Sequence, residues 1–120
     1  MPAHTYDVNV KGLMNLCTSI LSLSLIDKTK VFHASTSEMY GQVDLSLKDE
    51  TLITEEHPFK PMSPYALSKV SAYYMVQYYR RVYNMQICTA LSFNHESPLR
   101  NEEFITRKIT KGVARIKKGL

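Results

Sequence analysis

Cysteine is scarce in this sequence, and long apolar runs and metal-ligand spacings are missing from it. The two cysteines, Cys17 and Cys88, lie in separate apolar stretches, so we expect buried, reduced thiols of an intracellular protein. No run approaches the ~18 apolar residues that a membrane span needs, and no charged segment precedes an apolar core at the N-terminus. We therefore expect no membrane segment, no signal peptide and no metal site, and a cytoplasmic location.

The composition is that of one small globular domain. The chain has 120 residues, of which 44% are hydrophobic and 22% are charged, and its formal net charge is +4. Basic residues gather near the end of the chain: Arg107, Lys108, Lys111, Arg115, Lys117 and Lys118. This basic end suits an anionic ligand, but we do not expect nucleic acid because no stacking motif accompanies it.

Periodicity and capping signals predict three helices and two strands. The predicted helices span 6–27, 64–83 and 103–118, and the predicted strands span 30–34 and 86–93. Asp7 is the expected N-cap of the first helix. Ser63 and Asn84 are the expected caps of the second, in which Pro64 suits the first turn. A strand, a helix and a second strand form a right-handed parallel crossover, which is the signature of an α/β fold.

The pattern of side chains predicts which surfaces are covered. The tyrosines of the second helix spread around its circumference, which indicates core or subunit packing on two sides: Tyr73, Tyr74, Tyr78 and Tyr79. The apolar stripe of the last helix is expected to face inward: Phe104, Ile105, Ile109, Val113 and Ile116. Residues 41–62 contain prolines and acidic side chains and predict an irregular, solvated loop.

A phenol and an ammonium stand four residues apart at the start of the second helix. Tyr65 and Lys69 therefore lie on one helix face, one turn from each other. A neighbouring ammonium favours the phenolate, which allows the phenol to accept a proton from a substrate hydroxyl. Because the segments 35–41 and 94–100 both follow predicted parallel strands, we expect them to face each other across one crevice.

Each of these signals is weak when it is taken alone. A Tyr-x-x-x-Lys pair occurs by chance in many helices, Glu38 alone is more often a solvated carboxylate, and His95 alone is more often structural. Residues 94–98 alone suit a polar turn. The combination is more specific, because a hydroxyl cluster, a Tyr-x-x-x-Lys pair and a polar loop follow one another at strand ends.

Four stretches carry a family resemblance. They are Ala34-Ser-Thr-Ser-Glu-Met-Tyr-Gly41, Ser63-Pro-Tyr-Ala-Leu-Ser-Lys69, Phe93-Asn-His-Glu-Ser-Pro98 and Phe104-Ile-Thr-Arg-Lys-Ile109. With them, nearly the whole chain resembles the middle of the extended short-chain dehydrogenase/reductases, and specifically the GDP-mannose 4,6-dehydratase family. Residues 94–98 distinguish this family from sugar epimerases, which usually carry an Asn-x-Tyr-Gly-Pro type sequence there.

The resemblance implies a reaction and a role for each site residue. Tyr65, aided by Thr36, would remove the proton of the sugar 4-hydroxyl while hydride passes from C4 to NADP. Glu38 would take the C5 proton and help water leave C6, after which the hydride returns to C6. Lys69 would hold the nicotinamide ribose.

The same resemblance implies further binding residues and an assembly. His95 and Arg100 would contact NADP, as would Tyr65 and Lys69 of the catalytic set. Asn94 and Lys108 would hold GDP-mannose, with Lys108 next to its phosphates. The family also implies a homo-oligomer.

The chain departs from the family pattern in several places. The Gly-rich phosphate-binding turn, the first strands and the C-terminal substrate region are absent. We therefore expect residues 1–120 to form a partial, Rossmann-like NAD(P)-binding domain with a doubly wound parallel sheet. Alone it is expected not to bind NADP tightly or turn over. The 41–62 loop is about five residues longer than usual, and Leu99-Arg100-Asn101 replaces the usual Arg-Arg-Gly.

Two alternatives stay open at this point. One is a different nucleotide-sugar enzyme of the same family, either an epimerase or a reductase. The other is a non-catalytic protein that keeps the fold and pairs with an intact subunit.

Overall fold

The computed structural model describes residues 1–42 and 53–120 of the chain. Its elements follow in the order α1 (Pro2–Tyr6), the π-helix η1 (Asp7–Lys11), α2 (Gly12–Ser22), β1 (Val31–Ala34), the 3-10 helix η2 (Ser37–Tyr40), α3 (Pro64–Tyr83), β2 (Ile87–Ala90) and α4 (Ile105–Lys117). None of the helices in these two ranges is both long and apolar enough to cross a membrane.

The first three elements form one continuous helical rod, which differs from the prediction at both ends. The rod begins at Pro2, a residue that favours the first helical turn, and Asp7 lies inside it with helical φ and ψ. The prediction of Asp7 as N-cap is therefore wrong. The rod ends at Ser22 because Ser24 adopts a left-handed φ of 53° and Leu25 N–H donates to Ile20 O over 2.9 Å.

Helix α3 has the bounds that its caps predict. Ser63 Oγ accepts a hydrogen bond from Ala66 N–H over 3.0 Å, and Asn84 closes the other end with a φ of 52°. Both capping predictions are confirmed. The helix therefore starts at a fixed point next to the strand ends, and Tyr65 and Lys69 fall in its first two turns.

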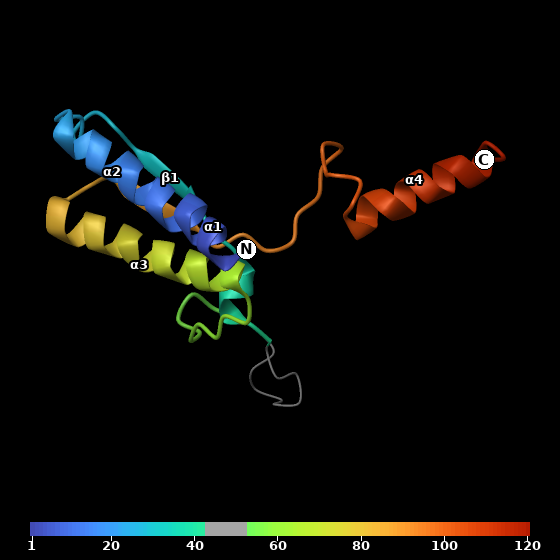
Figure 1. The fold of residues 1–120 in the computed structure, drawn as a ribbon, viewed down its shortest axis with the longest axis horizontal. Helices are drawn as coiled ribbons and strands as arrows, with labels where there is room; N and C mark the ends of the chain where they lie inside the picture. The colour runs from blue at the N-terminus through green and yellow to red at the C-terminus, as the bar shows by residue number, and fades with distance from the viewer. Residues whose placement is uncertain (43–52) are drawn as a thin grey trace.

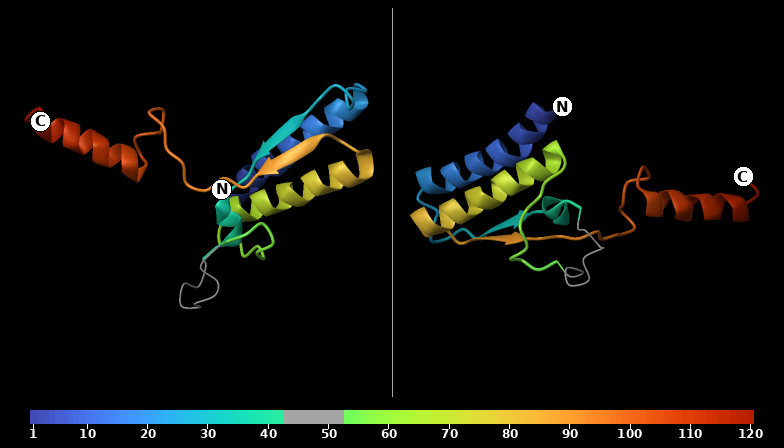
Figure 2. Two further views of the ribbon diagram at one scale, coloured as in Figure 1. Left: turned by 180° about the vertical axis from the view of Figure 1, so that it is seen from behind. Right: turned by 90° about the horizontal axis from the view of Figure 1, so that it is seen from below.

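The two strands form a parallel sheet with one covered face. Val31 pairs with Ile87 and Ala34 with Ala90, so the predicted parallel crossover is confirmed. Figure 2 shows α2 and α3 on the same side of the two strands. Phe32 is 71% exposed on the other side. Strand β2 ends at Ala90, earlier than the predicted strand 86–93.

The core lies between the sheet and these two helices. It is built from Leu13, Cys17, Ile20, Ala72, Val76, Tyr79, Met85 and Ile87. Cys17 is fully buried, as predicted, but Cys88 is exposed. The prediction for Cys88 is wrong because successive side chains of a strand point to opposite faces, and helices cover one of the two.

Helix α4 stands apart from the rest of the described chain (Figure 1). Its bounds agree with the predicted helix 103–118, but the predicted inward orientation of its apolar side chains is wrong. Phe104, Ile105, Ile109, Val113 and Ile116 are 47% to 78% exposed, because no element within 1–42 or 53–120 packs against them. The amphipathic pattern fixes which face is apolar, not what covers that face.

The tyrosines of α3 are buried on one side of the helix. Tyr79 is buried in the core, and the ring of Tyr73 meets Phe59 edge to face with centroids 5.0 Å apart. Tyr74 and Tyr78 are exposed, so core packing is wrong for them, and packing against another subunit stays a prediction. Of the predicted 41–62 loop, residues 43–52 lie outside the described ranges, and 53–62 contain no helix or strand.

Candidate functional site

The segments that leave the two strands run side by side. Ser35 N–H donates to Ala90 O and Ser37 N–H donates to Ser92 O, each over 2.9 Å. These bonds continue the sheet pairing beyond the last strand residues. These bonds join residues 35–37 to residues 90–92, so the predicted meeting of residues 35–41 with residues 94–100 is not confirmed.

The segment after β1 folds into η2, which presents Thr36 and Glu38. Thr36 is its N-cap, and its Oγ1 accepts from Glu38 N–H over 3.3 Å. The helix ends at Gly41, and Lys60 N–H donates to Met39 O over 2.9 Å, which ties η2 to the segment before α3. Glu38 consequently lines a hollow of about 180 Å³ that Ser63 and Ala66 of the α3 start also line.

Tyr65 and Lys69 come together as their spacing predicts. The Lys69 Nζ atom lies 5.6 Å from the centroid of the Tyr65 ring. The same Nζ donates to Ala34 O over 2.9 Å, so the ammonium is anchored at the last residue of β1. Burial lowers the pKa of Lys69 from its ordinary value. The cation thus lies between a strand end and a phenol that is 39% exposed.

The four predicted binding residues lie farther along the chain. Asn94 and Lys108 are exposed, and Lys108 belongs to α4. His95 Nδ1 donates to Phe93 O over 2.8 Å, because a carbonyl oxygen can only accept. The guanidinium of Arg100 stacks 3.7 Å above the Phe104 ring.

These four residues are not joined to the catalytic set in the structure. Across residues 1–42 and 53–120, no hydrogen bond or ion pair links them to Thr36, Glu38, Tyr65 or Lys69. Arg100 instead forms an ion pair with Glu96, with Nε and Oε2 3.5 Å apart. Among the described residues, the predicted catalytic set and the four predicted binding residues are therefore not joined by a hydrogen bond or an ion pair.

Three polar residues that sequence reasoning missed support the predicted catalytic set. Asn9 Nδ2 donates to Ser68 Oγ over 2.9 Å, and Ser68 Oγ donates to Tyr65 O over 2.7 Å. Ser68 is fully buried, and Asn9 lies in the π-helical segment η1, a geometry that is frequent at functional sites. His33 is buried beside Lys69. Strand alternation puts His33 on the face opposite Phe32, but the sequence alone does not show which of these faces the helices cover.

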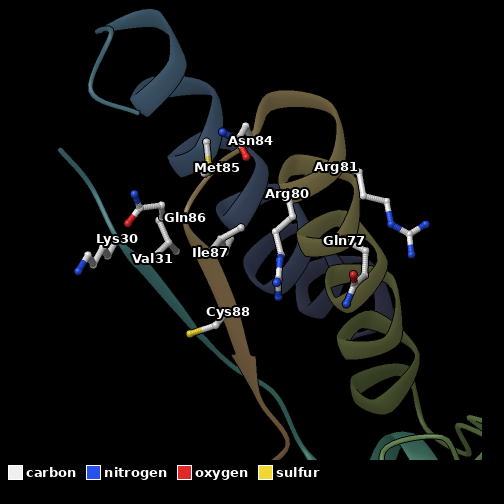
Figure 3. A pocket seen from close by; sticks show the side chains of 10 residues that line it. All are labelled: Lys30, Val31, Gln77, Arg80, Arg81, Asn84, Met85, Gln86, Ile87 and Cys88. Carbon is white, nitrogen blue, oxygen red and sulfur yellow. The ribbon is translucent and has the colours of Figure 1, made fainter. Parts of the chain in front are cut away.

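A larger hollow of about 760 Å³ lies at the opposite end of the strands, where β1 and β2 begin. Its basic side chains are Lys30, Arg80 and Arg81, and Figure 3 shows them pointing apart and not toward one centre. None of the predicted site residues lines this hollow. Its basic side chains do not converge on one point, so the strand-end group is the better candidate for chemistry.

Comparison with known sequences gives one consistent result. A model of the family described as GDP-mannose 4,6 dehydratase matches residues 1–120. A GDP-mannose 4,6-dehydratase of Vibrio cholerae is 48% identical over 119 residues, which are 99% of this chain and 31% of the relative. A GDP-mannose 4,6 dehydratase of Dictyostelium discoideum is 45% identical over 116 residues, which are 97% of this chain and 31% of the relative. The chain thus spans under a third of these relatives.

Solved structures agree on the fold. The structure of RMD from Pseudomonas aeruginosa complexed with NADPH matches with a TM-score of 0.90 and 28% identity, over 99% of this chain and 38% of that one. A dTDP-glucose 4,6-dehydratase of Bacillus anthracis in complex with NAD matches with a TM-score of 0.79 and 26% identity, over 92% of this chain and 33% of that one. Together with the parallel strands, these matches confirm the predicted Rossmann-like α/β class.

Proposed function

Because the chain belongs to the GDP-mannose 4,6-dehydratase family, we propose that it carries the catalytic segment of an enzyme that converts GDP-mannose to GDP-4-dehydro-6-deoxy-mannose. The observation that supports this most is the Lys69 ammonium, anchored 2.9 Å from Ala34 O and 5.6 Å from the Tyr65 ring centroid. It places a cation and a phenol at the same strand end that Thr36 and Glu38 follow.

In this proposal Tyr65 is the base for the sugar 4-hydroxyl. In this role the Tyr65 oxygen accepts the hydroxyl proton as C4 is oxidised, with the Lys69 cation 5.6 Å from the centroid of its ring. Thr36 Oγ1 shares the hydrogen bond to the 4-oxygen. The resulting ketone makes the C5 proton acidic. The asymmetry of the site, with a phenol on α3 and a carboxylate on η2, suits two successive proton transfers at neighbouring carbons.

Glu38 is proposed to do the second proton transfer. Its carboxylate removes the C5 proton and delivers it to the departing C6 hydroxyl, so that one water leaves. After reduction at C6, C5 takes up one proton, which matches the proton that Tyr65 removed from the 4-hydroxyl, so the proton count balances. The hollow beside Glu38, which the first turn of α3 also lines, gives this carboxylate room to face a ligand. Oxidation at C4 and reduction at C6 cancel, so the reaction needs no external reductant.

A nicotinamide cofactor fits the residues that are present. We propose NADP, which when bound supplies the hydride acceptor at C4 and the donor at C6. Lys69 lies at the carboxyl end of a parallel strand, where dinucleotides bind in open α/β sheets, and it has hydrogen-bond donors left for ribose hydroxyls. His95 and Arg100 are proposed as further NADP contacts. Residues 1–120 would form the central part of one NAD(P)-binding domain.

The sugar nucleotide, the assembly and the location are further parts of the proposal. We assign Asn94 and Lys108 to GDP-mannose, since an exposed ammonium suits a diphosphate. We also propose that copies of the protein associate, which the exposed apolar side chains of α4 support. A cytoplasmic location agrees with the free thiol of exposed Cys88.

The test replaces the matching segment of the Vibrio cholerae relative with residues 1–120 of this chain. The chimera is expected to form a 4-keto product from GDP-mannose. Tyr65→Phe and Glu38→Gln should each lower kcat by 100-fold or more, because each removes a proton-transfer group. Tyr74→Phe is the matched control, since this tyrosine lies on the same helix and is exposed. A folded chimera that binds NADP but forms no 4-keto product would contradict the proposal.

A further inference from the structure

Glu96 is an acidic residue to which the proposed reaction gives no role. It lies in the loop between β2 and α4, four residues before Arg100. Its Oε2 atom accepts a hydrogen bond from Thr106 Oγ1 over 2.8 Å, and the same oxygen lies 3.5 Å from Arg100 Nε. One carboxylate oxygen therefore contacts both the proposed NADP residue Arg100 and the first turn of α4.

The guanidinium of Arg100 is held on two sides. It stacks on the Phe104 ring, with Cζ 3.7 Å from the ring centroid, and this contact sets the plane of the group. Nε is buried and has no hydrogen-bond partner within residues 1–42 and 53–120. The Glu96 oxygen supplies a charge of opposite sign next to it. A carboxylate at Nε leaves the edge formed by the two terminal nitrogens for an anion such as a phosphate.

The Glu96 carboxylate also belongs to a set of contacts that join the loop to α4. The helix begins after Phe104, which makes no side-chain cap hydrogen bond, and its first turn contains no acidic residue. The contact with Thr106 brings a negative charge to this end, where the helix dipole favours one. Arg107 Nη1 adds a second link by donating to Pro98 O over 2.9 Å. The loop and the start of α4 are thus held together by two side-chain bonds.

We propose that Glu96 is a positioning residue: its carboxylate sets the direction of the Arg100 guanidinium and ties it through Thr106 to α4. This inference rests on the proposed function, in which Arg100 is assigned to NADP and Lys108 of α4 to GDP-mannose. The two side chains of the ion pair are 33% and 42% exposed, and so exposed a pair adds little stability. Its effect is therefore on ligand binding, because it holds a cation in one orientation before the cofactor arrives.

The first test follows the Arg100 Nε–H proton by NMR in the 120-residue chain with labelled arginine. Glu96→Ala should speed its exchange with water by about 10-fold, the effect of losing one charge-assisted contact. Thr106→Val removes the hydroxyl that holds the carboxylate and should act in the same direction. Thr106→Ser keeps that hydroxyl and should leave the exchange rate unchanged.

The second test measures the Kd for NADP by calorimetry in the Vibrio cholerae chimera, because the chain alone is not expected to bind NADP tightly. Glu96→Ala should raise this Kd by about 10-fold. Glu96→Gln keeps an acceptor for Thr106 but removes the charge beside Nε, so it should raise the Kd nearly as much. In a chimera that already carries Arg100→Ala, Glu96→Ala should add nothing further, because it acts through Arg100.

Glu103→Ala is the matched control. Glu103 is an exposed acidic residue just before α4, and its carboxylate makes no hydrogen bond or ion pair within the two described ranges. It should change neither the exchange rate nor the Kd.

Four results would overturn the inference. They are an unchanged exchange rate in Glu96→Ala, equal effects of Glu103→Ala and Glu96→Ala, an unchanged Kd in Glu96→Gln or in Arg100→Ala, and additive effects in the double variant. None of these readouts needs turnover. A chimera that binds NADP but forms no 4-keto product would refute the proposed function, while the role of Glu96 is decided by the exchange rate and the Kd.

Discussion

Gly41 follows the 3-10 helix that carries Glu38. It closes η2 with a φ of 69° and a ψ of −148°, a conformation that is nearly exclusive to glycine. A Cβ atom at this position would lie 2.0 Å from Lys60 O, which is a backbone atom and cannot rotate away. Gly41→Ala must therefore shift the backbone on one side of the contact.

The cost follows from two terms. Forcing a residue with a side chain into this region of φ and ψ costs about 1–3 kcal/mol. Separating the two segments also breaks the bond from Lys60 N–H to Met39 O, which contributes about 1 kcal/mol. Gly41→Ala should lower the free energy of unfolding by about 2–4 kcal/mol, a large share of the stability of a small domain.

Urea denaturation followed by circular dichroism measures this difference. Gly112→Ala is the matched control, because a Cβ at Gly112 meets nothing within 4 Å and the residue lies inside helix α4. It should be neutral or stabilise by up to about 1 kcal/mol. Equal unfolding midpoints for the two variants would refute the view that Gly41 holds η2 in place.

Three further predictions concern the frame of the site. In the same urea titration, Ser63→Ala should lower the free energy of unfolding by about 1 kcal/mol, because it removes the N-cap of α3. Ser71→Ala is the control and should be nearly neutral, because the Ser71 hydroxyl only donates to Leu67 O within the same helix. Val76→Ala should cost about 2 kcal/mol by thermal unfolding, because this side chain is fully buried. In a thiol-labelling assay the exposed Cys88 should react quickly. Cys17 should react only after unfolding, because it is buried and burial raises the pKa of its thiol. Equal labelling rates for the two thiols would contradict the packing.

Local signals predicted the part of the molecule that local interactions determine. The bounds of α3 follow from Ser63, Pro64 and Asn84, each of which acts within one helical turn. The meeting of Tyr65 and Lys69 follows from a spacing of four residues on a helix. These features need no knowledge of what packs against the helix, so the sequence is enough.

Contacts between distant segments were not predictable in the same way. The bond from Asn9 to Ser68 joins residues 59 positions apart, and the side chain of Asn9 alone does not indicate which helix it meets. The burial of Cys88 and of the α4 apolar face was predicted wrongly for a related reason. Hydrophobicity shows that a surface favours a partner, but the burial depends on which elements the chain places there.

The fate of the hydrogen at C4 of the sugar tests the central claim most directly. The Vibrio cholerae chimera that carries residues 1–120 would be given GDP-mannose with deuterium at C4, and the product would be analysed by NMR and mass spectrometry. The account predicts a 4-keto product with the deuterium on C6. Deuterium retained at C4 of an epimerised sugar, or a 4-keto product without deuterium on C6, would contradict it.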